Sequence, residues 1–174
     1  FAQTYTLDHT NRPRLIPDYL SSKSHTPLKI HIDGQFAYVG EVVNTINAGN
    51  YQLNFATDFL YSNAADYTYS TDEQSWNTTE LCALILKKIK LDIINSRHFG
   101  EEEFIVPVPD EHYPQHLPQL EAAFKLAEIN KVKFIPESTA IVLGHGLDWQ
   151  GANYRYALTY RIGASSFRAG IVRY

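Results

Sequence analysis

The stretch FIVPVPDEHYPQHLPQLEAAFKLAEINKVKFIPESTAIVLGHGL, residues 104–147, decides the fold because strand and helix patterns alternate in it with short connections. FIVPVP (104–109) is a short apolar run rich in β-branched residues, and KVKFI (131–135) is a second short strand pattern. Between them, LPQLEAAFKLAEI (117–129) repeats apolar residues every three or four positions, which is the period of a helix. PESTAIVLGHGL (136–147) predicts a second helix. Two strands joined through a helix are expected to lie parallel, with a right-handed crossover.

The sequence predicts the buried face of the first of these helices and the C-terminal end of the second. The first presents an apolar face made of Leu117, Leu120, Ala123, Phe124 and Ala127. The second is expected to stop at Gly144 and Gly146, since glycine accommodates the left-handed conformation of a helix C-cap. This central unit therefore predicts an α/β fold.

Upstream, the clearest signal is a β-hairpin in LKIHIDGQFAYVG (28–40). Asp33-Gly34 separates two alternating runs, and Asp-Gly supplies the positive backbone angles of a two-residue hairpin turn. Weaker extended patterns lie at 2–7 and 15–22, with a turn-rich segment between them.

The middle of the chain predicts a long amphipathic helix from Asn77 to Gly100. Asn77 and Glu80 have the spacing of a capping box, which explains Asn77-Thr78-Thr79 better than a glycosylation acceptor does. The helix face expected to be buried consists of Leu81, Leu84, Ile85, Ile89 and Ile93. The cations expected largely off that face are Lys87, Lys88 and Lys90. Residues 62–75 before this helix read as a loop or a small exposed hairpin.

Two alternating strands, 156–163 and 165–174, end the pattern. Together these elements predict an α/β fold with a mixed sheet and flanking helices. The 174 residues fit one domain, 1–174, in which residues 41–78 are a candidate for a small inserted subdomain.

Composition narrows the class of protein. The net charge of −4 and the lack of a Lys/Arg stripe argue against nucleic-acid binding. The single cysteine, Cys82, excludes an internal disulfide framework and fits a reducing, cytoplasmic compartment. We expect no membrane partner, because no apolar run approaches the ~20 residues of a membrane-spanning helix. The chain begins with Phe1, from which we expect a fragment of a longer protein.

Few residues have the spacing of a chemical site. His112 and His116 are four apart, but Pro114 lies between them, so a polar loop entering a helix is preferred to a metal site. Cys82 lies within a helix beside its apolar face and is predicted to be core, because no group is placed to lower its pKa. Asp110, Glu111 and Glu121 follow the first central strand, where α/β sheets place ligands, but without a predicted partner they fit solvent-facing positions equally well.

The central stretch resembles the nucleotide-binding domain of the seventy-kilodalton heat-shock chaperones, from the Val-Pro strand end of that family to its Asn-Glu-Pro-Thr helix start. The residues that match in register are Val108, Pro109, Ala123, Ala127, Ile135, Glu137, Thr139, Ala140, Gly146, Leu147 and Asp148. RLIPDYLS (14–21), YVGEVV (38–43) and TELCALILKKIK (79–90) are similar to family segments in the same order. The resemblance implies lobe I of an actin-like, ribonuclease-H-like ATPase domain.

The family's functional residues are mostly changed. Its catalytic lysine aligns with Thr57. Its second phosphate loop, Asp-Leu-Gly-Gly-Gly-Thr-Phe-Asp, aligns with residues 161–168, where Arg161 and Arg168 replace both aspartates. The intervening loop, Gly163-Ala164-Ser165-Ser166, is a degenerate phosphate loop with added side chains where the backbone must approach phosphate closely.

The charge reversal predicts loss of magnesium-assisted hydrolysis, since phosphoryl transfer depends on positioning and electrostatic stabilisation. Arginine still pairs with phosphate, so the resemblance implies either no cofactor or ATP/ADP bound without hydrolysis, and no bound metal. Glu137 has two interpretations, a metal–water group by resemblance or a helix N-terminal carboxylate, and the second is preferred.

We therefore expect a divergent, catalytically silent member of this chaperone family that acts as an interaction or regulatory module. Its expected partners are chaperones, co-chaperones or ribosome-associated factors, by analogy with atypical family members. An exposed lobe face would also favour a homodimer. The alternative is a working ATP-dependent folding chaperone whose first phosphate loop lies outside this sequence. A third and weaker alternative is another actin-like ATPase, such as a sugar kinase or filament protein.

Overall fold

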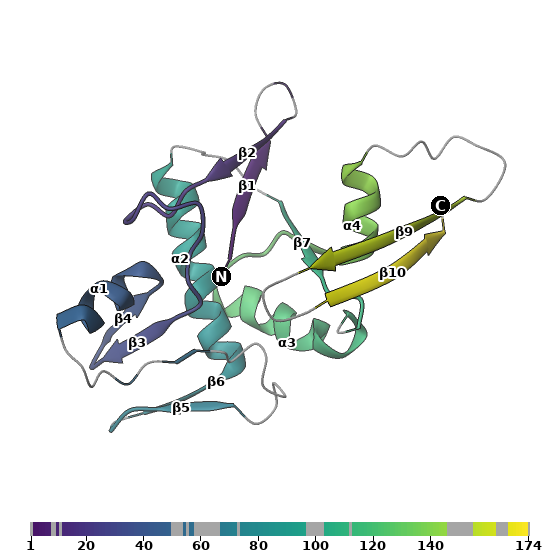
Figure 1. Cartoon of the computed structure of the whole chain (residues 1–174). Helices are drawn as coiled ribbons and strands as arrows, with labels where there is room; N and C mark the ends of the chain where they lie inside the picture. The colour runs from purple at the N-terminus through teal and green to yellow at the C-terminus, as the bar shows by residue number, and fades with distance from the viewer. Residues whose placement is uncertain are drawn as a thin grey trace. The chain divides into compact units, whose positions relative to one another are not determined.

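The computed structural model has an α/β fold in which four helices accompany small sheets (Figure 1). The residues that it describes are 2–7, 10, 12–49, 54, 56–57, 67–72, 74–96, 103–111, 113–145, 155–162 and 167–173. They form two compact units. Unit 1 comprises Phe1–Glu101 and Leu120–Asn130, and unit 2 comprises Glu102–Gln119 and Lys131–Tyr174.

Unit 1 is built from three antiparallel strand pairs and two helices of its own. Strands β1 (Thr4–Leu7) and β2 (Pro13–Ile16) pair, and β3 (Ile30–Asp33) pairs with β4 (Phe36–Val39). Helix α1 (Glu41–Gly49) follows, then the hairpin of β5 (Thr68–Ser70) and β6 (Ser75–Asn77), then α2 (Thr78–Asn95). The apolar core of this unit contains Ile30, Ile32, Val39, Ala56, Tyr69, Leu81 and Ile85.

The β3–β4 hairpin forms as predicted, but its turn is one residue later than expected. Asp33 pairs with Phe36, so Gly34 and Gln35 are the two turn residues. Gly34 has φ of +55° and Gln35 is not in the positive region, the φ pattern of a type II′ turn rather than the expected Asp-Gly turn. This register places Val39 opposite Ile30 in the core, whereas Phe36 is exposed.

Helix α2 confirms the predicted capping box. The Asn77 side chain accepts the Glu80 amide at 3.0 Å, and the Glu80 carboxylate accepts the Asn77 amide at 2.8 Å. The helix ends at Asn95, capped by Ser96, rather than at Gly100, and residues 97–100 lie outside the described part of the chain. The predicted face packs into or against the core of unit 1, with Leu81, Ile85 and Ile93 fully buried.

Unit 2 contains the predicted parallel pair. Strand β7 (Phe104–Val108) pairs in parallel with β8 (Val132–Pro136), and α4 (Glu137–Gly144) follows directly and packs against both. The last two strands, β9 (Tyr156–Ile162) and β10 (Phe167–Arg173), form an antiparallel hairpin that contacts α4.

Helix boundaries in the central stretch differ from the prediction. Helix α3 (Tyr113–Leu126) begins four residues before the expected Leu117, which the first-turn position of Pro114 permits because amides there have no helical acceptor. Helix α4 does not end in a left-handed glycine: His145 caps it with φ of −83°, and Gly144 is not in the positive-φ region. Gly146 lies outside the described residues.

The expected continuous mixed sheet is not formed by the described residues, whose strands pair two by two in five small sheets. Proline contributes to this, because it cannot donate to a neighbouring strand. Pro107 lies within β7 and Pro136 ends β8, so each strand of the parallel pair lacks one donor.

Candidate functional site: an arginine–glutamate cluster in unit 2

Four charged residues from four segments meet in unit 2. Glu137 is the first residue of α4, and Glu111 lies in the turn after β7. Arg161 in β9 and Arg168 in β10 are directly opposite each other in the hairpin register, so they project from the same face of the sheet. We call these four residues the arginine–glutamate cluster.

Ion pairs connect the four residues of the cluster in a line from Arg161 to Glu111. Arg161 Nη1 donates to Glu137 Oε1. Arg168 Nη1 lies 3.7 Å from Glu137 Oε2, and Arg168 Nε donates to Glu111 Oε1 at 2.5 Å. The Glu137 side chain is only 17% exposed, whereas Arg161 is about half exposed. Glu137 is therefore clamped between both arginines on the partly buried side of the cluster.

The N-terminus of α4 is held in place by a residue distant in sequence. Pro136 occupies the cap position and has no side-chain hydrogen-bonding group. Asp110 supplies the missing acceptor: Ser138 donates to it through the backbone amide at 3.1 Å and through Oγ at 2.5 Å. This contact fixes the first turn of α4, and with it the position of Glu137.

The β9–β10 hairpin lies close to that first turn. A Cβ added at Gly170 would be 3.2 Å from Thr159 Oγ1 and 3.4 Å from Ser138 Cβ. A Cβ could make the contact with Ser138 without strain, whereas the contact with Thr159 would be tight, so a side chain at position 170 would displace Thr159 slightly. Gly170 therefore allows β9 and β10 to pack closely beside the start of α4, near the two arginines.

The sequence predicted three of the residues that meet here by resemblance, namely Glu137, Arg161 and Arg168. It also named Glu111 as a polar residue after the first central strand, without assigning it a partner. Thr57 belongs to unit 1, and Gly163, Ala164, Ser165 and Ser166 lie outside the described residues. The pairing of arginine with glutamate depends on the register of β9 with β10, and a linear pattern does not specify it.

The cysteine and histidine candidates from the sequence do not form a chemical site among the described residues. Burial raises the pKa of Cys82 to about 12, and its partly buried side chain packs against the core of unit 1, close to the predicted core position. His116 lies in α3 rather than in the expected loop, and His112 is outside the described residues. No three metal-ligating side chains come together among the residues that the structure describes.

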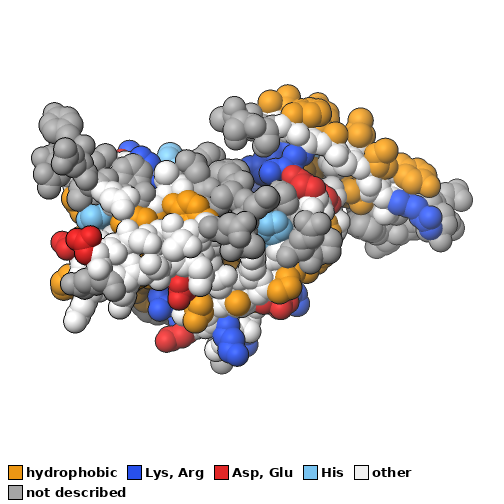
Figure 2. Space-filling model, turned by 90° about the horizontal axis from the view of Figure 1, so that it is seen from below, with side chains coloured by type: hydrophobic (Ala, Val, Ile, Leu, Met, Phe, Trp, Pro, Cys, Tyr) orange, Lys and Arg blue, Asp and Glu red, His pale blue; other side chains and the backbone are white. Residues whose placement is uncertain are grey.

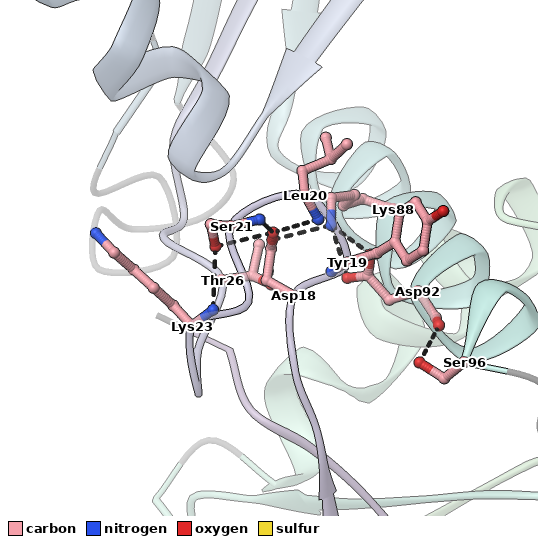
Figure 3. Close-up of polar contacts among 9 residues, drawn as sticks. All are labelled: Asp18, Tyr19, Leu20, Ser21, Lys23, Thr26, Lys88, Asp92 and Ser96. Carbon is pink, nitrogen blue, oxygen red and sulfur yellow. Dashed lines mark hydrogen bonds and ion pairs between the residues drawn. The ribbon is translucent and has the colours of Figure 1, made fainter.

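A second charged cluster, in unit 1, was missed by sequence reasoning (Figure 3). Lys88, expected largely off the buried face of α2, donates to Asp18 Oδ2 at 2.9 Å and to Asp92 Oδ1 at 2.5 Å. The Asp18 side chain is 1% exposed and Asp92 7%. We call these three residues the buried triad.

The chain around Asp18 turns instead of extending over 15–22 as predicted. Asp18 accepts the amides of Leu20 and Ser21 at 3.1 and 2.9 Å, the pattern by which aspartate stabilises a turn. Burial acts to raise the pKa of Asp18, but hydrogen bonds from Lys88 and Ser21 and the charge of Lys88 outweigh it and lower the pKa. The buried triad thus fastens the 18–21 turn to α2.

Comparison with known proteins adds no family assignment, because no family model matches the chain. No helix in the described part of the chain is long and apolar enough to cross a membrane.

Proposed function

We propose that this chain is a divergent relative of the seventy-kilodalton heat-shock nucleotide-binding domain, with an actin-like first lobe, that does not hydrolyse ATP. It would act in the cytoplasm as an interaction module for other chaperones or their co-factors. One observation carries the proposal: the arginines at the positions of the family's two aspartates are paired with Glu137 and Glu111.

The chemistry of the cluster supports this proposal. A magnesium ion is held by carboxylate oxygens and water in a near-octahedral shell. Both carboxylates of the cluster instead accept from guanidinium groups. Each arginine about 5 Å from a magnesium ion would also repel it by roughly 2 kcal/mol even in a water-like dielectric. A divalent ion would have to displace three ion pairs and overcome two repulsions.

Nucleotide binding is compatible with the cluster even without hydrolysis. Guanidinium groups pair with phosphate oxygens in the same geometry that they use with carboxylates. A phosphate at this place would compete with Glu137 and Glu111 for Arg161 and Arg168. Magnesium would then weaken nucleotide binding or leave it unchanged, whereas the family's usual chemistry requires magnesium to help position the phosphates.

The test is calorimetric titration with ATP in the presence and absence of magnesium, combined with steady-state phosphate release. We expect no turnover above the rate of buffer, and an ATP affinity that magnesium does not increase. Steady phosphate release that Glu137→Gln abolishes would contradict the proposal and favour the working chaperone ATPase.

The matched control for that variant is Glu103→Gln. Glu103 is another carboxylate of unit 2 in an ion pair, with Lys133 at 2.8 Å, but it is half exposed and lies outside the cluster. A loss of turnover that appeared equally in both variants would report general damage rather than catalysis by Glu137.

A further inference from the structure

The β9–β10 hairpin exposes its apolar face instead of burying it. Residues directly opposite in an antiparallel pair lie on the same face, and Leu158 pairs with Ile171 and Ile162 with Phe167. The large apolar side chains of this face are Tyr156, Leu158, Tyr160, Ile162, Phe167 and Ile171, each between 66% and 76% exposed. We call this surface the outer face of the hairpin.

The opposite face of the same hairpin is the one that packs on α4. It carries Arg161, Arg168 and the buried Thr159, together with the partly buried Ala157 and Val172. An antiparallel sheet that packs on the protein with one face normally buries its apolar face and leaves its polar face in water. Here the arginines are drawn inward by Glu137 and Glu111, so the apolar residues are left outside.

The outer face is contiguous and almost uncharged. Figure 2 shows hydrophobic side chains gathered at the upper right, over the hairpin. Among the positions of this face in β9 and β10, Arg173 at the end of β10 is the one formal charge. With side chains of the order of 200 Å² each, the six residues expose roughly 800 Å² of mainly apolar surface. The largest apolar patch on a typical monomer is only about 300–600 Å².

From this surface we infer that the outer face of the hairpin is a homodimer interface, in which two copies of the chain pack their β9–β10 hairpins face to face. The exposed area matches the roughly 800 Å² that each partner contributes to a standard stable interface. Apart from Arg173 at its end, the face carries no formal charge that would require a partner of opposite charge, so an identical apolar face can cover it. A two-fold axis brings the same patch of both subunits together, and aligned sheets pack in this way about 10 Å apart.

The inference does not depend on the proposed function, because it rests on the apolar face and not on the arginine–glutamate cluster. The measurement is sedimentation equilibrium of the 174-residue chain over a range of protein concentrations. We expect a mass of twice 19.8 kDa. A monomer at roughly 100 µM would overturn the inference, since a stable interface of this size should form well below that concentration. Growth into larger aggregates without a dimer plateau would overturn it as well.

The decisive variant is Ile171→Glu, which places a charge at the centre of the outer face. We expect the dimer dissociation constant to rise at least a hundredfold, because two carboxylates would be buried against each other across the axis. Its matched control is Ile105→Glu, which changes the same residue type on another strand of unit 2, where the side chain is 61% exposed. Equal weakening by both variants would contradict the assigned face.

A crosslinking variant tests the interface without adding a charge. Ala169 lies on the outer face opposite Tyr160, and Cys82, the single cysteine, is partly buried against the core of unit 1 and has a raised pKa. Ala169→Cys therefore supplies one reactive thiol per chain. A bismaleimide of about 10 Å span, the separation of packed sheets, should link two copies efficiently. Failure of this reagent to produce dimers would count against face-to-face packing even if Ile171→Glu did not fold.

Discussion

The buried triad of unit 1 and the arginine–glutamate cluster of unit 2 use the same kinds of charge in opposite ways. In the triad, Lys88 lies between Asp18 and Asp92, and backbone amides complete the coordination of both carboxylates. In the cluster, the side chains of Arg161 and Arg168 donate to Glu137 and Glu111, and Arg161 remains half exposed. The first arrangement is permanent and structural, whereas the second leaves its cations open to exchange with another anion.

The difference shows that burial, not the number of ion pairs, separates a structural charge cluster from a candidate binding site. A buried carboxylate that loses its cation retains the full cost of desolvation. A half-exposed guanidinium that loses its carboxylate is solvated by water, so the loss is small. The half-exposed Arg161 can therefore lose its ion pair at a lower cost than the buried Lys88.

Removing the cation of the buried triad should have the largest effect. Lys88→Met would leave Asp18 and Asp92 buried without a positive partner, and should lower the free energy of unfolding by about 3–5 kcal/mol. Urea unfolding followed by circular dichroism measures this change. Lys87→Met, an exposed neighbour on α2, is the matched control and should change stability by less than about 0.5 kcal/mol. A loss below about 1 kcal/mol for Lys88→Met would mean that the triad is not structural.

Neutralising one acid of the triad should have a smaller, pH-dependent effect. The pKa of Asp18 is lowered in the folded chain, so its ionised form stabilises the fold above the unfolded pKa near 4, and this stability is lost as pH falls through the lowered value. Asp18→Asn should cost about 1–3 kcal/mol at neutral pH and flatten the acid side of the stability curve. Asp33→Asn, at the exposed end of β3, serves as the control. An unchanged acid limb in Asp18→Asn would contradict the assignment.

The smallest effect is expected in the arginine–glutamate cluster. Arg161→Met should lower the free energy of unfolding by less than about 1 kcal/mol, because Arg161 is half exposed and surface ion pairs contribute little. The loss should shrink further at high salt, which screens exposed charges. The measurement is urea unfolding at low and high ionic strength. A decrease in the free energy of unfolding that is independent of salt and as large as that of Lys88→Met would contradict the difference proposed between the two clusters.

Local patterns predicted much of the fold. The capping box at Asn77 and Glu80 forms as expected because both partners lie within one helical turn. The parallel pairing of β7 with β8 follows from the helix that connects them. The prediction failed where two neighbouring turn positions were both compatible with the local sequence. The turn of the β3–β4 hairpin moved by one residue, which brought Val39 rather than Phe36 toward the core.

By itself, the sequence determined the α/β class, the start of α2 set by its local capping box, and the presence of two arginines, Arg161 and Arg168, in the last two strand segments. These features depend on residue types a few positions apart. The tertiary structure decided which carboxylates meet those arginines, which lysine is buried, and which face of the β9–β10 hairpin is left in water. Each of those outcomes joins segments up to 70 positions apart in the chain, as with Asp18 and Lys88. Their free energy depends on burial and register, which local residue patterns do not encode.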